Sequence, residues 1–144
     1  MAYRFTDSPG KLLQDLSRSF GRYLHAEMKD QGFNINIHEW STLSYLSSNQ
    51  QASQKEIAGF LGVEKVYAKR LLDRLERKGL LTRRQDSADR RYNIIELTNN
   101  GREMFKNLKP LAERTIHQAR KHISEEAYSS FLQTIRKMQD NLEK

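Results

Sequence analysis

The stretch Ser53–Gly79, SQKEIAGFLGVEKVYAKRLLDRLERKG, carries the strongest structural signal in the sequence. Ser53 is followed three residues later by Glu56, the pattern of a capping box in which each side chain satisfies a backbone N–H group of a new helix. Gly62 ends that short helix, and a second helix opens at Glu64 with apolar residues at helical spacing. Two short helices joined by a tight glycine-containing turn predict a helix-turn-helix.

Two strand-like runs follow this segment, residues 80–84 and 92–97, with the polar residues 85–91 between them. Runs of this kind on either side of a polar turn are typical of a β-hairpin. A helix-turn-helix followed by a hairpin predicts a winged helix, in which the hairpin is the wing.

Helical patterns also precede the helix-turn-helix. A Ser-Pro pair at residues 8–9 begins a long run of apolar residues at helical spacing that ends at Gly32. Asn36 with Glu39 forms another capping box before a further apolar stripe. The polar residues 47–51 that follow this helix are expected to form a loop.

Two more helices are expected after the wing, the first capped by Thr98 and the second by Ser124. The chain has 17 Leu but only 2 Val, a balance that favours helices over sheets. The expected fold class is therefore mainly α with a small β-hairpin wing, a winged helix-turn-helix flanked by N- and C-terminal helices.

The charge distribution indicates an anionic partner. The 144 residues suffice for one domain and carry a net charge of +7. Residues 64–91 alone hold ten Lys and Arg against five Asp and Glu. A membrane-surface helix would pair such a charged face with a wide apolar one, whereas this stretch contains a turn and two hydrophobic periods. Nucleic acid is therefore favoured over lipid.

Several classes of protein are excluded by what the sequence lacks. Without cysteine there is no disulfide framework, thiol nucleophile or zinc-thiolate site, and a reducing compartment is favoured. No apolar run is long enough to span a bilayer and no export signal is evident, so a cytoplasmic location is expected. The four histidines have no metal-binding spacing, and no catalytic motif is present, so we expect no metal, no cofactor and no enzyme.

Four motifs extend the pattern: Leu61-Gly62-Val63, Leu75-Glu76-Arg77-Lys78-Gly79-Leu80, Asp86-x-x-Asp89-Arg90-Arg91 and Leu97-Thr98-x-x-Gly101. Together with the order of the helices, they resemble the multiple antibiotic resistance regulator (MarR) family over nearly the whole chain. The resemblance implies a homodimer that binds pseudo-palindromic operator DNA as a repressor and is released by a small ligand. It implies an N-terminal dimerisation helix (residues 1–34), a winged helix-turn-helix DNA-binding domain (35–98) and C-terminal dimerisation helices (99–144).

In such a fold the second helix of the pair enters the major groove, and its outward side chains read base edges or hold phosphates. The match to the family's wing motif implies that Arg91 enters a minor groove, that Asp89 orients it and that Arg90 contacts phosphate. The alternative is a solvated hairpin tip. Glu64 departs from the Ser or Thr that the family often has near this position. The residues expected to contact DNA are Ser53, Gln54, Lys65, Val66, Tyr67, Lys69, Arg70, Arg74, Asp89, Arg90 and Arg91.

So small a module needs two linked copies for tight and specific binding. Apolar stripes on the terminal helices supply the link, and the alternative is a helical bundle within one chain. The expected dimer-interface residues are Leu12, Leu16, Phe131, Ile135, Met138 and Leu142.

A ligand-responsive regulator also needs a cavity between the dimerisation helices and the winged helix. Candidate lining residues are Tyr23, His25, His38, Trp40 and Tyr45. For Trp40 a place in the core is the competing interpretation, because it lies at helical spacing from Leu43. By family analogy the ligand is a small aromatic or phenolic anion.

The sequence thus predicts a dimeric, sequence-specific DNA-binding transcriptional regulator. Two alternatives stay open: a structural DNA-binding protein with little sequence preference, and a winged helix used for protein–protein contact. A regulator should prefer its palindrome over bulk DNA by about 10³ or more. A protein-docking version would lack the combination of Lys65, Lys69, Arg70 and Arg91.

Overall fold

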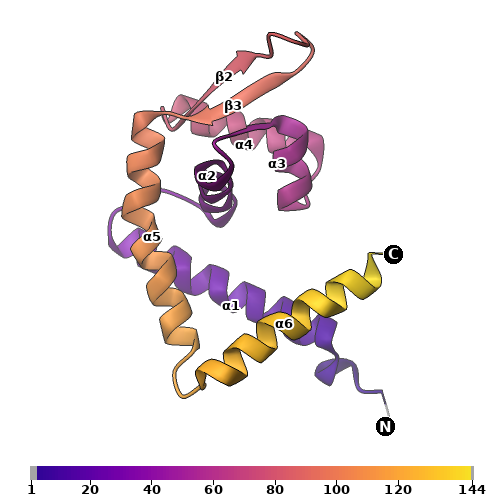
Figure 1. Ribbon diagram of the computed structural model, residues 1–144. Coiled ribbons are helices and arrows are strands. Elements are labelled where there is room, and N and C mark those ends of the chain that lie inside the picture. Colours follow the sequence, from indigo (N-terminus) through magenta and orange to yellow (C-terminus); the bar gives the residue numbers. More distant parts are fainter. Residues whose placement is uncertain (1–2, 144) are drawn as a thin grey trace.

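Six α-helices and a three-stranded sheet make up residues 3–143, the part of the chain that the computed structural model describes (Figure 1). In chain order the elements are the 3-10 helix η1 (Phe5–Asp7), α1 (Pro9–Asp30), α2 (Ile37–Asn49), β1 (Gln51–Ser53), α3 (Gln54–Leu61), α4 (Lys65–Arg77), β2 (Leu81–Gln85), β3 (Asn93–Leu97), α5 (Asn99–Ala119) and α6 (Glu125–Leu142). Five of the helices begin with a side-chain cap, at Ser8, Asn36, Ser53, Thr98 and Ser124, as predicted.

The wing belongs to an antiparallel sheet with the strand order β1-β3-β2. Strands β2 and β3 form the expected hairpin, with Arg83 opposite Ile95. The loop predicted at residues 47–51 is wrong, because α2 continues to Asn49 and Gln51–Ser53 pairs with β3. This three-residue strand is mostly polar, so its formation depends on the free edge of β3 and not on a local pattern.

The hydrophobic core lies between α2, α3, α4 and the sheet. Leu43, Ile57 and Ile95 are fully buried in it. The same cluster continues into Met28 of α1 and Leu108 of α5, so both long helices are anchored to the winged helix. Figure 1 shows α1 and α5 leading away from the winged helix, with α6 crossing the N-terminal half of α1. No helix within residues 3–143 combines the length and apolarity needed to cross a bilayer.

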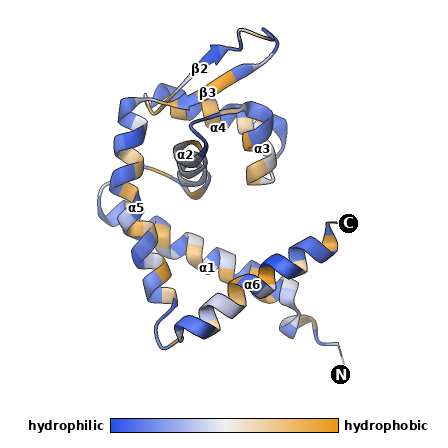
Figure 2. Ribbon diagram, viewed as in Figure 1, coloured by the Kyte–Doolittle hydropathy of each residue, from blue (hydrophilic) through white to orange (hydrophobic). Residues whose placement is uncertain are grey.

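The terminal helices leave much of their apolar surface exposed. Helix α6 contains no buried residue, and Leu12, Phe131 and Leu142 are 54%, 41% and 84% exposed. Figure 2 shows hydrophobic positions along α1 and α6, outside the winged helix. A bundle closed within one chain would bury this surface, so the intrachain alternative does not describe the fold.

Candidate nucleic-acid interface

Helix α4 has one buried face and one open face. Ala68, Leu71, Leu72 and Leu75 pack into the core. The side chains predicted to meet the major groove are all exposed: Lys65, Val66, Tyr67, Lys69 and Arg70. Among these cations Val66 is 64% exposed, which leaves its methyl groups open to contact a thymine methyl group. The helix starts without a side-chain cap, because Glu64 makes no capping hydrogen bond.

A cavity of about 620 Å³ joins the start of α3, the start of α4 and the wing. Ser53, the cap of α3, lines it together with Gln54 of α3, Lys65 of α4 and Arg91 of the wing. Lys55 also lines it and is a residue that the sequence interpretation missed. No carboxylate is among the described residues that line this cavity, so three cations surround a space suited to a phosphate.

At the wing, Asp89 holds Arg91 in a defined position. The Arg91 guanidinium donates to the Asp89 carboxylate through Nη2 at 2.8 Å and through Nε at 3.0 Å, and the Arg91 backbone N–H donates to Asp89 Oδ1 at 3.0 Å. These bonds lower the pKa of Asp89 and raise that of Arg91. The Arg91 side chain is 84% exposed, so the pair projects a pre-oriented guanidinium into solvent.

Asp73 of α4 ties this helix to strand β2 of the wing. It accepts from Lys69 Nζ at 3.1 Å and from Arg83 Nη2 of β2 at 2.5 Å. Arg83 first and Lys69 second lower the pKa of the Asp73 carboxyl. Asp73 therefore neutralises part of the charge that Lys69 would present to a phosphate. The sequence interpretation identified Lys69 but missed both Asp73 and Arg83.

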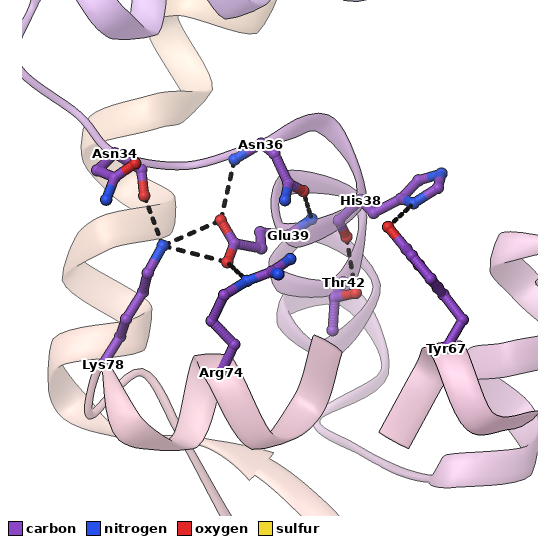
Figure 3. A network of polar contacts seen from close by, with 8 residues as sticks. All are labelled: Asn34, Asn36, His38, Glu39, Thr42, Tyr67, Arg74 and Lys78. Atoms are coloured by element: carbon purple, nitrogen blue, oxygen red, sulfur yellow. Dashed lines mark hydrogen bonds and ion pairs between the residues drawn. The ribbon is translucent and has the colours of Figure 1, made fainter. Parts of the chain in front are cut away.

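Arg74, predicted to contact the DNA backbone, is paired with a buried carboxylate of α2, although its own side chain is 41% exposed (Figure 3). Its Nε donates to Glu39 Oε1 at 2.6 Å, and Lys78 Nζ donates to both Glu39 oxygens at 3.1 Å. The Glu39 side chain is only 2% exposed and also accepts from the Asn36 backbone N–H at 2.9 Å. The capping box of α2 was predicted, but this second role of Glu39 was not.

The pKa of the Glu39 carboxyl reflects two opposing effects. Burial raises it, because removal from water disfavours the charged form. Hydrogen bonds from the Asn36 backbone, Arg74 and Lys78 lower it by more, so the pKa lies below its usual range. Glu39 is therefore a carboxylate at neutral pH, buried and fully paired.

Tyr67 and His38 contact each other, although one was predicted to meet DNA and the other to line a ligand cavity. The Tyr67 hydroxyl group lies 2.7 Å from His38 Nδ1, and the two rings meet edge to face. His25 joins them in lining a hollow of about 360 Å³.

The five predicted ligand-pocket residues are not brought together in one cavity. Tyr23 lines a separate hollow of about 270 Å³ between α1 and α5. The Trp40 ring stacks on Phe105 of α5, with centroids 5.4 Å apart, so the core interpretation of Trp40 holds. The Tyr45 ring packs on the Phe60 ring, with centroids 4.5 Å apart. Helical spacing places side chains on a common face but does not show which neighbour covers that face.

Within residues 3–143 no cluster of potential metal ligands is found.

Comparison with known proteins supports the winged-helix interpretation. Residues 35–92 match the sequence model of the MarR family. The uncharacterized HTH-type transcriptional regulator YdgJ of Bacillus subtilis (strain 168) is 26% identical over 100 residues, which are 69% of this chain and 61% of that relative's own length.

Solved structures show the same fold over nearly the full length. BpsR of Bordetella bronchiseptica, whose DNA binding is regulated by 6-hydroxynicotinic acid, has a TM-score of 0.85 at 21% identity, covering 97% of this chain and 99% of BpsR. A crystal structure of MarR gives a TM-score of 0.84 at 24% identity, covering 99% of this chain and 95% of that one. The predicted mainly α fold with a wing is confirmed.

Proposed function

The chain belongs to the MarR family of winged-helix transcriptional regulators, and from that starting point we propose that it acts as a dimeric repressor which a small aromatic anion releases from DNA. Family and fold are those of transcriptional regulators and not of enzymes. The observation that carries the DNA-binding part is the cavity lined by Lys55, Lys65 and Arg91, which three separate segments build without a carboxylate.

In the proposed complex α4 lies in the major groove and the wing beside it. Lys65, Val66 and Arg70 meet base edges or phosphates, and Arg91 enters the flanking minor groove. A narrow minor groove concentrates negative potential, and a guanidinium already oriented by Asp89 enters it at little entropic cost.

The dimer is proposed from the exposed apolar surface of the terminal helices. We propose that residues 1–34, the N-terminal arm, and residues 99–144, the C-terminal arm, form the dimer, and that residues 35–98 bind DNA. Leu12, Leu16, Phe131, Met138 and Leu142 are exposed in the single chain, and a two-fold partner would bury them. Ile135, also expected there, is half-buried. Two recognition helices would then lie roughly 34 Å apart, one turn of DNA.

The effector site is proposed at the hollow lined by His25, His38 and Tyr67. A ligand there would contact a residue of the recognition helix directly, which gives it a route to change DNA affinity. An aromatic anion is chosen because 6-hydroxynicotinic acid regulates BpsR. Trp40 and Tyr45 are left out of this site, since their rings are packed on Phe105 and Phe60.

A footprint on the DNA flanking the protein's own gene tests the proposal. A protected palindrome, preferred over bulk DNA by about 10³ or more, supports a regulator. Uniform protection at the same concentrations would support a structural DNA-binding protein instead, and no protection would favour a protein-docking winged helix. Repeating the footprint with 6-hydroxynicotinic acid and a panel of phenolic acids tests the effector, because an effector should remove the protection.

A further inference from the structure

Glu39 joins the first turn of α2 to the recognition helix α4 (Figure 3), and we infer that it is a positioning residue that sets how α4 is presented to DNA. We call the group formed by Asn34, Glu39, Arg74 and Lys78 the α2–α4 latch. The inference rests on the proposed function, since it assumes that α4 reads the operator.

The latch restrains both the translation of α4 along its axis and the rotation of α4 around that axis. Glu39 is held on its own helix by the Asn36 backbone N–H at 2.9 Å, so its carboxylate does not move freely. Arg74 and Lys78 are one helical turn apart and reach the same carboxylate. A shift of α4 along its axis would therefore require both side chains to change conformation to keep these bonds.

A second contact restrains the N-terminal end of α4. Tyr67 lies seven residues before Arg74, close to two helical turns, and its hydroxyl group bonds to His38 beside Glu39. The first turn of α2 thus supports α4 at both ends. Lys69 lies on the opposite side of α4 from these contacts, whereas Arg70 neighbours them, three residues after Tyr67 and four before Arg74; both side chains are exposed.

The latch also connects α4 to the segment that leads to α1. Lys78 Nζ donates to the backbone carbonyl oxygen of Asn34 at 2.6 Å, between the end of α1 and the start of α2. Helix α4 is therefore bonded to the loop between α1 and α2, in addition to its packing in the core of the winged helix.

Glu39 has an electrostatic effect in addition to its geometric one. It neutralises part of the charge of Arg74 and Lys78, whose side chains are 41% and 26% exposed. With Glu39 uncharged, both cations would be released to bind phosphate wherever DNA is offered. Loss of the latch should therefore weaken binding to the operator and strengthen binding to unrelated DNA, two changes of opposite sign.

The substitution Glu39→Gln tests this, because glutamine keeps the size and the capping acceptor while removing the charge. The probes are a duplex selected from random sequence by the wild-type protein and a scrambled duplex of equal length. We expect the preference for the selected duplex to fall roughly tenfold, within the usual range of coupling between sites. For scrambled DNA, the slope of the logarithm of the binding constant against the logarithm of the salt concentration should steepen by up to about 0.9 for each released cation that binds a phosphate. A merely structural defect would weaken both complexes and would not steepen that slope.

Glu113→Gln is the matched control. Glu113 is an exposed residue of α5 paired with Lys109, so this variant makes the same change in net charge far from α4 along the chain. It should leave the preference unchanged. In the double variant Glu39→Gln/Lys78→Gln, removal of one released cation should return the salt slope toward that of the wild type.

Lys78→Met serves if Glu39→Gln fails to fold, since it leaves the Glu39–Arg74 bond in place. It should give a smaller loss of preference in a folded protein, and a preference equal to that of the wild type would contradict the inference. A wild-type chain without any sequence preference would contradict the proposed function and this inference together. A wild-type preference that folded Glu39→Gln retains, with an unchanged salt slope, would contradict the inference alone.

Discussion

Gly101, in the first turn of α5, lies so close to the carbonyl oxygen of Leu80 that a Cβ atom at position 101 would overlap it. The same oxygen accepts from the Thr98 backbone N–H at 3.1 Å. The Thr98 hydroxyl group donates to the Gly79 carbonyl oxygen at 2.5 Å and accepts from the Gly101 N–H at 3.0 Å. The motif Leu97-Thr98-x-x-Gly101 is therefore the joint that attaches α5 to the segment after the recognition helix.

Gly101→Ala should lower the free energy of unfolding by about 1–3 kcal/mol, since backbone has to move to accept the new methyl group. Urea denaturation measures this. Gly59→Ala is the control, because Gly59 also lies in a helix but open space surrounds the position that a Cβ atom would take there. It should stabilise the protein by about 0.5–1 kcal/mol. Equal effects of the two substitutions would refute the close approach at Gly101.

Arg91→Ala should weaken operator binding by about 1–3 kcal/mol while leaving the dimer intact. The guanidinium that Asp89 orients is then lost from the wing. Binding can be measured by fluorescence anisotropy and assembly by sedimentation. Unaltered affinity would mean that the wing tip is merely solvated.

Arg70→Ala should flatten the salt dependence of DNA binding more than Lys69→Ala does. Each lost phosphate contact in each half-site lowers the slope by about one unit. Lys69 Nζ is paired with the Asp73 carboxylate at 3.1 Å, so part of its charge is already neutralised and it contributes less. Titrations over a range of salt concentrations measure both slopes. Identical slopes for the two variants would argue against this effect of Asp73.

Phe131→Asp should shift the protein from dimer toward monomer. Phe131 is 41% exposed in the single chain, and the proposed interface would enclose the new carboxylate without a partner. Sedimentation velocity at micromolar concentration measures the change. A variant that stays fully dimeric would place the interface elsewhere.

Acid should destabilise the wild-type protein more than it destabilises the Glu39→Gln variant. The folded-state pKa of Glu39 is lowered, so its stabilisation is complete above the unfolded-state pKa and is lost as pH falls through the folded-state pKa. Between about pH 5 and pH 3 the unfolding free energy of the wild type should therefore fall more steeply. Urea denaturation at several pH values compares the two proteins, and parallel pH profiles would show that Glu39 is not held as a paired carboxylate.

The helices and the wing could be predicted because their signals are local. Capping pairs such as Asn36 with Glu39, and the left-handed turn at Gly62, lie within a few residues of the element that they bound. Strand β1 could not be predicted in this way, since its three residues pair with a strand that lies far along the chain. Tertiary pairing, and not propensity, makes it a strand.

The candidate site was predictable as a set of exposed cations but not as a network. Sequence position identifies Lys69 and Arg74. The partner of Lys69, Asp73, is four residues away on the same helix, a spacing that the sequence shows, whereas the partner of Arg74 comes from packing. Glu39 and Arg74 are 35 residues apart. Trp40 and Tyr45 do not line the hollow of His25 and His38 for the same reason, because their rings meet partners that no spacing reveals.

Helix α6 has 18 residues and none of them is buried, so in an isolated chain it depends on its own marginal helical propensity. In the proposed assembly its order comes from meeting a second molecule, which makes the folding of this end sensitive to dilution. In that assembly, copy number would act on the folding equilibrium itself. A cell that makes little of this protein would hold chains with frayed C-terminal ends and intact winged helices, and gene dosage would alter their capacity to act even before any effector is present.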